Sequence, residues 1–168
     1  MIRRATPADV ESIARVHITA WHESYRELIE DAAFDIYTVE KRIAQWRGTL
    51  DNPDVVVLVA ERDGAVCGFG SAGKPRTELP TASEIYAFYL LDAVKRQGVG
   101  RKLFARLCTE LTARDFASLG LWVLANNAPA RRFYEAMGGR LGKTHIDRRG
   151  EFAFEDIAYI WDDLAQLR

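Results

Sequence analysis

The segment from Ser83 to Leu111 constrains the fold more than any other part of the chain. Ser83–Leu91 is rich in aromatic and branched side chains, which is typical of a central strand. A turn that contains Gly98 and Gly100 follows, and leucines then recur at helical spacing. A glycine-containing turn from a strand into a helix exposes unpaired backbone N–H groups at the positive end of the helix dipole. Such a turn can bind phosphate.

Positive charge is concentrated around this turn. Its residues are Lys95, Arg96, Gln97, Gly98, Val99, Gly100 and Arg101. Three cations would attract a phosphate, and glycine lets a ligand approach the backbone closely because it has no Cβ. Taken alone, the pattern fits equally well a strand-to-helix turn that binds no ligand.

The rest of the chain also alternates between strands and helices. Before the central strand we predict a strand at Ile2–Ala5, helices at about Pro7–Leu28 and Val39–Leu50, and a hairpin of Val55–Ala60 and Val66–Ala72. After the glycine turn and its helix we predict a strand at Leu119–Leu124, a helix from Asn127 to Gly138, and strands at Arg140–Ile146 and Phe152–Trp161 around a turn at Arg149–Gly150. This order predicts one α/β domain over residues 1–168, a mixed, twisted sheet with helices on both faces.

Composition excludes several classes of function. The chain has 23 basic and 24 acidic residues, so it has no net field for nucleic acid or for an anionic membrane. It has neither a signal peptide nor an apolar run of about 20 residues, and we expect a cytoplasmic protein. Cys67 and Cys108 fit a reduced core. His17 and His22 are not spaced to share a helix face, and no metal is expected.

The glycine turn resembles the acyl-CoA site of the GNAT superfamily, whose signature is Gln/Arg-x-x-Gly-x-Gly/Ala. Lys95 stands where the family usually has Gln or Arg. The later run Asn127-x-x-Ala130-x-x-Phe133-Tyr134-Glu135 is similar to a second signature of that family, although Gly138-Gly139 replaces the usual Gly-Phe. The order of elements also resembles that of GNAT proteins over nearly the full chain.

The resemblance implies a mostly antiparallel sheet and an N-acetyltransferase that moves an acetyl group from acetyl-CoA to a primary amine by direct attack. It places the pantetheine arm along the strand residues Phe88, Tyr89, Leu90 and Leu91, and the pyrophosphate at Lys95–Arg101. Asn127 would contact the cofactor or only cap its helix. A catalytically silent acyl-CoA-binding sensor of the same fold is the alternative.

Two residues acquire catalytic roles from the same resemblance. Tyr134 would protonate the departing thiolate, since a phenol of pKa about 10 can donate to a thiolate whose parent pKa is about 8.5. Glu84 would accept a proton from the amine, directly or through a water. The alternatives are a core tyrosine and a carboxylate held in solvent or in a salt bridge.

Acceptor binding in GNAT proteins usually involves the first helices. Candidates here are Trp21, His22, Glu23 and Tyr25, and Tyr86 joins them because strand alternation predicts that it shares a face with Glu84 and Phe88. His17 lies on the apolar stripe of its helix and is interpreted as a core residue. The partner would be a small-molecule or peptide amine, which the sequence does not identify, and a homodimer fits the commonest symmetry of oligomers.

Overall fold

The computed structural model describes residues 1–30, 34, 37–149 and 151–167. Over this part of the chain the sheet has seven strands in the order β1-β2-β3-β4-β5-β7-β6. The strands are β1 (Ile2–Arg4), β2 (Val56–Arg62), β3 (Ala65–Gly73), β4 (Ser83–Leu90), β5 (Leu119–Leu124), β6 (Arg140–Arg149) and β7 (Phe152–Trp161). Neighbours are antiparallel except β4 and β5, which are parallel. The predicted mixed, mostly antiparallel sheet is confirmed.

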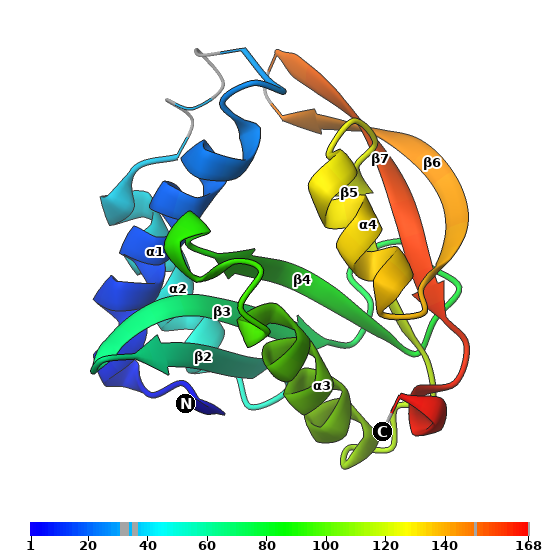
Figure 1. The fold of residues 1–168 in the computed structure, drawn as a ribbon, viewed down its shortest axis with the longest axis horizontal. Coiled ribbons are helices and arrows are strands. Elements are labelled where there is room, and N and C mark those ends of the chain that lie inside the picture. Colours follow the sequence, from blue (N-terminus) through cyan, green and yellow to red (C-terminus); the bar gives the residue numbers. More distant parts are fainter. Residues whose placement is uncertain (31–33, 35–36, 150, 168) are drawn as a thin grey trace.

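Helices cover both faces of the sheet, as predicted (Figure 1). The helices are α1 (Val10–Tyr25), α2 (Val39–Leu50), α3 (Val99–Thr112) and α4 (Ala128–Ala136), and short 3-10 turns lie at Pro7–Asp9, Asp92–Val94 and Leu164–Gln166. One buried cluster joins α1 and α2 to one face of β2 and β3, and a second joins α3 and α4 to the opposite face. Of the helices described, none is long and apolar enough to cross a bilayer.

Several predicted boundaries differ from the structure. Strand β6 runs to Arg149, three residues beyond the predicted Ile146, and the first helix differs at both ends. The first helix was expected from Pro7 to Leu28, but its first turn is a 3-10 turn and α1 ends at Tyr25. The Asp9 carboxylate tightens the beginning because it accepts the Thr6 N–H at 2.7 Å. At the other end the Leu28 N–H donates to the Tyr25 carbonyl in a turn. The predicted turn at Arg149–Gly150 includes Gly150, which lies outside the described residues.

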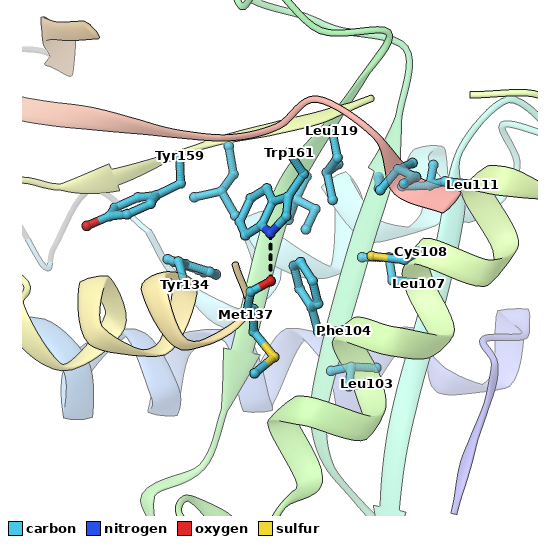
Figure 2. Packing of buried hydrophobic residues seen from close by; sticks show 14 of the residues in the cluster. Leu103, Phe104, Leu107, Cys108, Leu111, Leu119, Tyr134, Met137, Tyr159 and Trp161 are labelled. Atoms are coloured by element: carbon cyan, nitrogen blue, oxygen red, sulfur yellow. Dashed lines mark hydrogen bonds between the residues drawn. The ribbon is translucent and has the colours of Figure 1, made fainter. Parts of the chain in front are cut away.

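Helix α4 is fixed to the sheet by one tryptophan. The Trp161 indole N–H donates to the Met137 carbonyl at 2.9 Å, and its ring packs among the aromatic residues of the second cluster (Figure 2). A Cβ on Gly139 would lie 2.7 Å from Cζ2 of Trp161. Gly139 therefore leaves the space that the indole occupies. This packing holds α4, and with it Tyr134, against β7 and β5.

A β-bulge in β4 changes which side chains share a face. In the ladder with β3, Ala87 and Ile85 face consecutive residues, so Tyr86 is the additional residue. Without the bulge, strand alternation would put Tyr86 and Phe88 on the same face. Phe88 instead packs with Ile85 against the α3 and α4 cluster, whereas Tyr86 packs with the α1 and α2 cluster. The prediction that Phe88 shares a face with Glu84 and Tyr86 is therefore wrong.

His17 is a core residue, as interpreted from its place on the apolar stripe. Its side chain is buried, and its Nδ1 accepts a hydrogen bond from the Trp46 indole N–H at 3.2 Å. Burial, together with the charge of Arg42, lowers the pKa of His17 to about 3. The imidazole therefore stays neutral in the folded protein at pH values between about 3 and about 6.5, where an unfolded histidine, with its pKa of about 6.5, takes up a proton.

This burial predicts a loss of stability in mild acid. Because the folded pKa of His17 is depressed, its contribution is fully present above the unfolded pKa of about 6.5 and is lost as the pH falls towards about 3. Between pH 7.5 and pH 5 the free energy of unfolding should fall by about 2 kcal/mol from this residue. Urea titrations should show a clearly smaller fall in His17→Phe. The control is His22→Asn, which changes an exposed histidine and should leave this fall as in wild type. An equal fall in the free energy of unfolding between pH 7.5 and pH 5 in wild type and in His17→Phe would contradict the account.

Candidate active site

The parallel strands β4 and β5 separate after a short paired stretch. They pair only where Ser83, Glu84 and Ile85 lie opposite Leu119, Gly120 and Leu121. Beyond this point residues 87–90 of β4 continue to pair with β3, and residues 122–124 of β5 continue to pair with β7. Each strand thus has one edge without a strand partner among the described residues, and Figure 1 shows the two halves of the sheet diverging there. An extended ligand could hydrogen-bond to such an edge.

The glycine turn forms the N-terminus of α3 near the end of β4. Gly98 is the N-cap residue and has a φ of +80°, a left-handed conformation that glycine adopts without steric cost. Within the described part of the chain, no acceptor contacts the N–H groups of Val99, Gly100 or Arg101. The space beyond the α-carbon of Gly98 is open to 4 Å. The turn therefore presents free N–H donors and the positive helix end to an anion.

The second glycine of the turn brings α3 close to β4. A Cβ on Gly100 would lie 2.9 Å from Cδ1 of Leu90 and 3.3 Å from Cε2 of Phe133. Any side chain at this position would push the helix away from the strand and from α4. Gly100 therefore places the free N–H groups beside the last residues of the unpaired β4 edge.

The charged residues of the turn differ in their availability. Arg96 and Arg101 are exposed, and no carboxylate in the described residues pairs with either. Lys95 forms an ion pair with Asp92 at 2.7 Å. An anion at the turn would meet two unpaired guanidinium groups, while Lys95 would contribute a charge that Asp92 already balances.

The Gln97 side chain is used inside the loop. Its Nε2 donates to the Ala93 carbonyl at 2.8 Å, and its Oε1 accepts from Arg62. These bonds tie the turn to the loop after β4 and to the end of β2. Gln97 therefore shapes the turn, and its side chain is already engaged within the protein.

A cleft of about 250 Å³ opens between the diverging strands and α1. Side chains from α1, the loop before β4, and strands β4 to β7 line it. They are Trp21, Tyr25, Ile29, Thr77, Glu84, Ile85, Tyr86, Tyr89, Trp122, Val123, Leu124, His145, Asp147, Phe154 and Asp156.

The cleft brings together most of the predicted acceptor residues. Trp21, Tyr25 and Tyr86 line it beside Glu84. His22, in contrast, is exposed and stacks on Phe34 with ring centroids 4.4 Å apart. Glu23 lies outside the cleft as well, because its Oε2 accepts the backbone N–H of Asp92 at 2.8 Å.

Glu84 is buried and anchors the loop that precedes β4. Its Oε2 accepts the N–H groups of Arg76 and Thr77, at 2.8 and 3.1 Å, and the Thr77 hydroxyl at 3.0 Å. Its other oxygen, Oε1, has no hydrogen-bond partner in the described part of the chain. Tyr86 supports the same loop, since its hydroxyl donates to the Lys74 carbonyl. The carboxylate is therefore held in one orientation at the closed end of the cleft.

Tyr134 lies on the opposite side of the diverging strands from the cleft. It is buried among aromatic residues of α4, β4 and β7, and Figure 2 shows its ring beside Tyr159. Burial raises the pKa of Tyr134 well above the ordinary value of 10, and the nearby Tyr89 phenol adds to the effect. No described residue hydrogen-bonds to the Tyr134 hydroxyl. The phenol therefore stays protonated and keeps its O–H available.

Asn127 caps α4. Its side-chain oxygen accepts the Ala130 N–H at 3.2 Å, and the side chain is buried. The capping interpretation from the sequence is thus confirmed, and it leaves the side-chain amide NH₂ free of any role in the cap.

Sequence reasoning missed the contribution of the β6–β7 hairpin. His145 lies opposite Asp156, and Asp147 lies opposite Phe154, so all four side chains share the face that lines the cleft. The available signal was alternation by two along each strand. It would have shown which side chains share a face, but only the pairing of β7 with β5 places that face at the cleft.

Comparison with known proteins agrees with this geometry. The family model of the Acetyltransferase (GNAT) family matches residues 17–139. The uncharacterized N-acetyltransferase YuaI of Bacillus subtilis is 30% identical over 169 residues, which cover 99% of this chain and 95% of the relative. The chain therefore belongs to the GNAT family, and it is an acetyl-CoA-dependent N-acetyltransferase of that family.

Solved structures have the same fold. The PaiA N-acetyltransferase of Thermoplasma acidophilum, in complex with coenzyme A, aligns with a TM-score of 0.76 at 18% identity, over 96% of this chain and 98% of its own. The yncA protein of Salmonella typhimurium, with its cofactor acetyl-CoA, aligns with a TM-score of 0.74 at 20% identity, over 96% of this chain and 92% of its own.

The glycine turn predicts a matched pair of variants. Gly98→Leu should weaken acetyl-CoA binding about tenfold or more, because a side chain at this position occupies the ligand's space and disturbs at least one charge-assisted hydrogen bond. Gly64→Leu is the control, since Gly64 has a similar φ of +78° and the same open surroundings in the β2–β3 turn. Titration calorimetry should find wild-type affinity for Gly64→Leu. Equal affinity in both variants would show that the turn does not bind the cofactor.

Proposed function

We propose that this enzyme transfers the acetyl group of acetyl-CoA to a primary amine by direct attack of the amine on the thioester. The separation of β4 and β5 carries the proposal. It leaves an unpaired strand edge that leads from the cleft to the free N–H groups of α3. A proton donor, Tyr134, and a carboxylate, Glu84, lie on opposite sides of the same opening.

Acetyl-CoA would bind along this edge. Its pyrophosphate would lie at the N-terminus of α3, contacted by the N–H groups of residues 99–101 and by Arg96 and Arg101. The pantetheine arm would pair with the backbone of residues 88–90. Leu91, which the sequence also suggested, is excluded because its N–H donates to the Cys67 carbonyl and its carbonyl accepts from the Val94 N–H. A backbone N–H of β4 would polarise the thioester carbonyl, as oxyanion donors do. Asn127, at the start of α4, would contact the arm from the other side of the opening.

Proton transfers at the acceptor nitrogen and at the thiolate complete the reaction. An alkylammonium has a pKa near 10, so the acceptor must lose a proton before its nitrogen can attack the carbonyl carbon. Glu84 would take that proton, through Oε1 or a bridging water, while its Oε2 remains bonded to the loop. As the C–S bond breaks, Tyr134 would donate its proton to the thiolate. After attack the nitrogen still carries one proton more than an amide does. This proton would return to the Tyr134 phenolate, directly or through a water, and Glu84 would release its own proton to solvent when products leave.

The raised pKa of Tyr134 is compatible with this role. A desolvated thiolate also holds a proton more strongly, and burial raises the pKa of the Cys108 thiol to about 12. In a dry site the pKa of the Tyr134 phenol and that of the CoA thiol therefore both rise. Burial likewise raises the pKa of Cys67. Neither cysteine is a good nucleophile, which favours direct transfer over an acyl-enzyme route.

Replacing the proposed proton donor tests this function. Tyr134→Phe should lower kcat about 100-fold or more, the usual size of a general acid's contribution, with the KM for acetyl-CoA changed less than about threefold. The measurement is release of free CoA thiol with a panel of primary amines. Unchanged kcat would remove Tyr134 from the mechanism, and acetyl-CoA binding without turnover of any amine would indicate a silent binding module.

Tyr159→Phe is the matched control. Tyr159 is also buried, but its hydroxyl is engaged by structural groups: it donates to Glu135 at 2.6 Å and accepts from Arg131 at 3.2 Å. Its removal should lower the free energy of unfolding by about 1–2 kcal/mol and leave kcat within about threefold of wild type. A large loss of kcat in both variants would indicate general damage to the core.

A further inference from the structure

We propose that the acceptor is a slender amine with a second positive charge, of the α,ω-diamine class, and that the β6–β7 hairpin binds the charge that does not react. This inference rests on the proposed acetyl transfer to amines. It adds the chemistry of the acceptor, which neither the fold nor the relatives supply.

The charge of the cleft lining favours a cation. Three carboxylates line it, those of Glu84, Asp147 and Asp156, and within the described residues no lysine or arginine does. The summed negative charge of the lining favours a positively charged ligand. An acceptor that carries its own carboxylate, such as an amino acid, would meet no lysine or arginine among the described lining residues and would lose its hydration.

The walls of the cleft suit a hydrocarbon chain between two amines. Six aromatic side chains form them: Trp21, Tyr25, Tyr86, Tyr89, Trp122 and Phe154. Aromatic faces pack against methylene groups and also attract a nearby ammonium through the cation–π interaction. A volume of about 250 Å³ is large enough for a thin, extended molecule such as a diamine.

The carboxylates occupy two separate places along β5. Glu84 lies opposite Gly120, where the strands are still paired, and Asp156 lies opposite Leu124, at the far end of β5. Four residues of strand separate these positions, roughly 13 Å of backbone. Glu84 would therefore receive the reacting amine, and Asp156 with its neighbour Asp147 would receive a second ammonium several bonds away.

His145 gives an independent indication of a ligand. It lies opposite Asp156 in the ladder and lines the cleft, yet its Nδ1 is buried and has no hydrogen-bond partner in the described part of the chain. Its ring is held edge-on to Trp122, with centroids 3.9 Å apart. A buried nitrogen without a partner is costly unless a bound group satisfies it. An ammonium N–H donor beside Asp156 would do so once the imidazole turns its Nδ1 towards the cleft.

A metal ion is the other ligand that carboxylates and imidazole could hold. Within the described residues, however, no three His, Cys, Asp or Glu side chains are close enough together to do so. The spread of the acidic groups along the cleft matches two separated ammonium groups better than one compact cation.

Three acceptors that differ only at one end test the inference. They are 1,6-diaminohexane, hexylamine and 6-aminohexanoate, which end in an ammonium, a methyl group and a carboxylate. The kcat/KM measured by CoA release should be highest for the diamine, and about tenfold or more above that of 6-aminohexanoate. The second ammonium of the diamine forms a hydrogen-bonded charge pair with the hairpin carboxylates, whereas these carboxylates repel the carboxylate of 6-aminohexanoate. Equal values for the three, or a preference for 6-aminohexanoate, would overturn the inference and leave amine acetylation standing.

Variants of the hairpin locate the second charge. Asp147→Asn and Asp156→Asn should lower kcat/KM for the diamine about tenfold while changing that for hexylamine less than about threefold. The control is Glu155→Gln, which removes an exposed carboxylate from the other face of β7. Asp147 is the more exposed of the two, so its variant keeps the test valid if Asp156→Asn does not fold. An equal loss for both acceptors, or none, would contradict the assignment.

Failure of this inference is distinguishable from failure of the proposed function. Turnover of hexylamine without any preference for the diamine would reject only the second-charge site. If none of the three acceptors releases CoA, calorimetric titration of the enzyme and acetyl-CoA with 1,6-diaminohexane decides. Absence of saturable binding rejects the diamine class, whereas saturable binding that Asp147→Asn weakens about tenfold supports it.

Discussion

The separation of β4 from β5 is the constraint on which the rest of the site depends. Two parallel strands that pair for three residues and then diverge leave backbone donors and acceptors that the protein itself does not satisfy. Such groups are costly when buried unless a ligand pairs with them. A buried cluster that includes Ile85 of β4, Leu121 of β5 and Trp161 of β7 packs both halves of the sheet against α3 and α4. The positions of the two strand edges are therefore set by the core of the protein.

Each functional group depends on this opening for its environment. Tyr134 is dry because α4 is held on the sheet by Trp161, and its raised pKa follows from that burial. Glu84 lies where the paired stretch ends, and the loop before β4 fixes its orientation. The glycine turn lies at the far end of β4, where Gly100 allows α3 to approach Leu90. One extended ligand along β4 would thus reach the glycine turn and both side chains to which we assign proton transfer.

Local signals in the sequence predicted the parts of the site that depend on local geometry. The glycine turn could be recognised for two local reasons. The left-handed residue at the start of α3 favours glycine at Gly98, and the close approach of α3 to β4 requires glycine at Gly100. The elements and their order were also predictable, because burial on one face imposes a period on each helix and strand.

The remaining parts depend on contacts between distant segments. The bulge at Tyr86 reverses the alternation of β4, so Phe88 turns away from the cleft and Tyr89 faces it. No residue type at that position announces a bulge. His145 and Asp156 line the same cleft as Glu84 only through the order β4-β5-β7-β6, which is a property of the whole sheet. Long-range pairing of this kind leaves no pattern in a single sequence.

Hydrogen–deuterium exchange with and without acetyl-CoA tests the central claim most directly, that the diverging strands and the glycine turn together bind this molecule. Acetyl-CoA at saturation should slow exchange in residues 86–90 of β4 and in residues 99–101 at the start of α3, and leave the β1–β2 pair unchanged. Unchanged exchange in both segments, with binding confirmed by calorimetry, would place acetyl-CoA elsewhere and contradict the account.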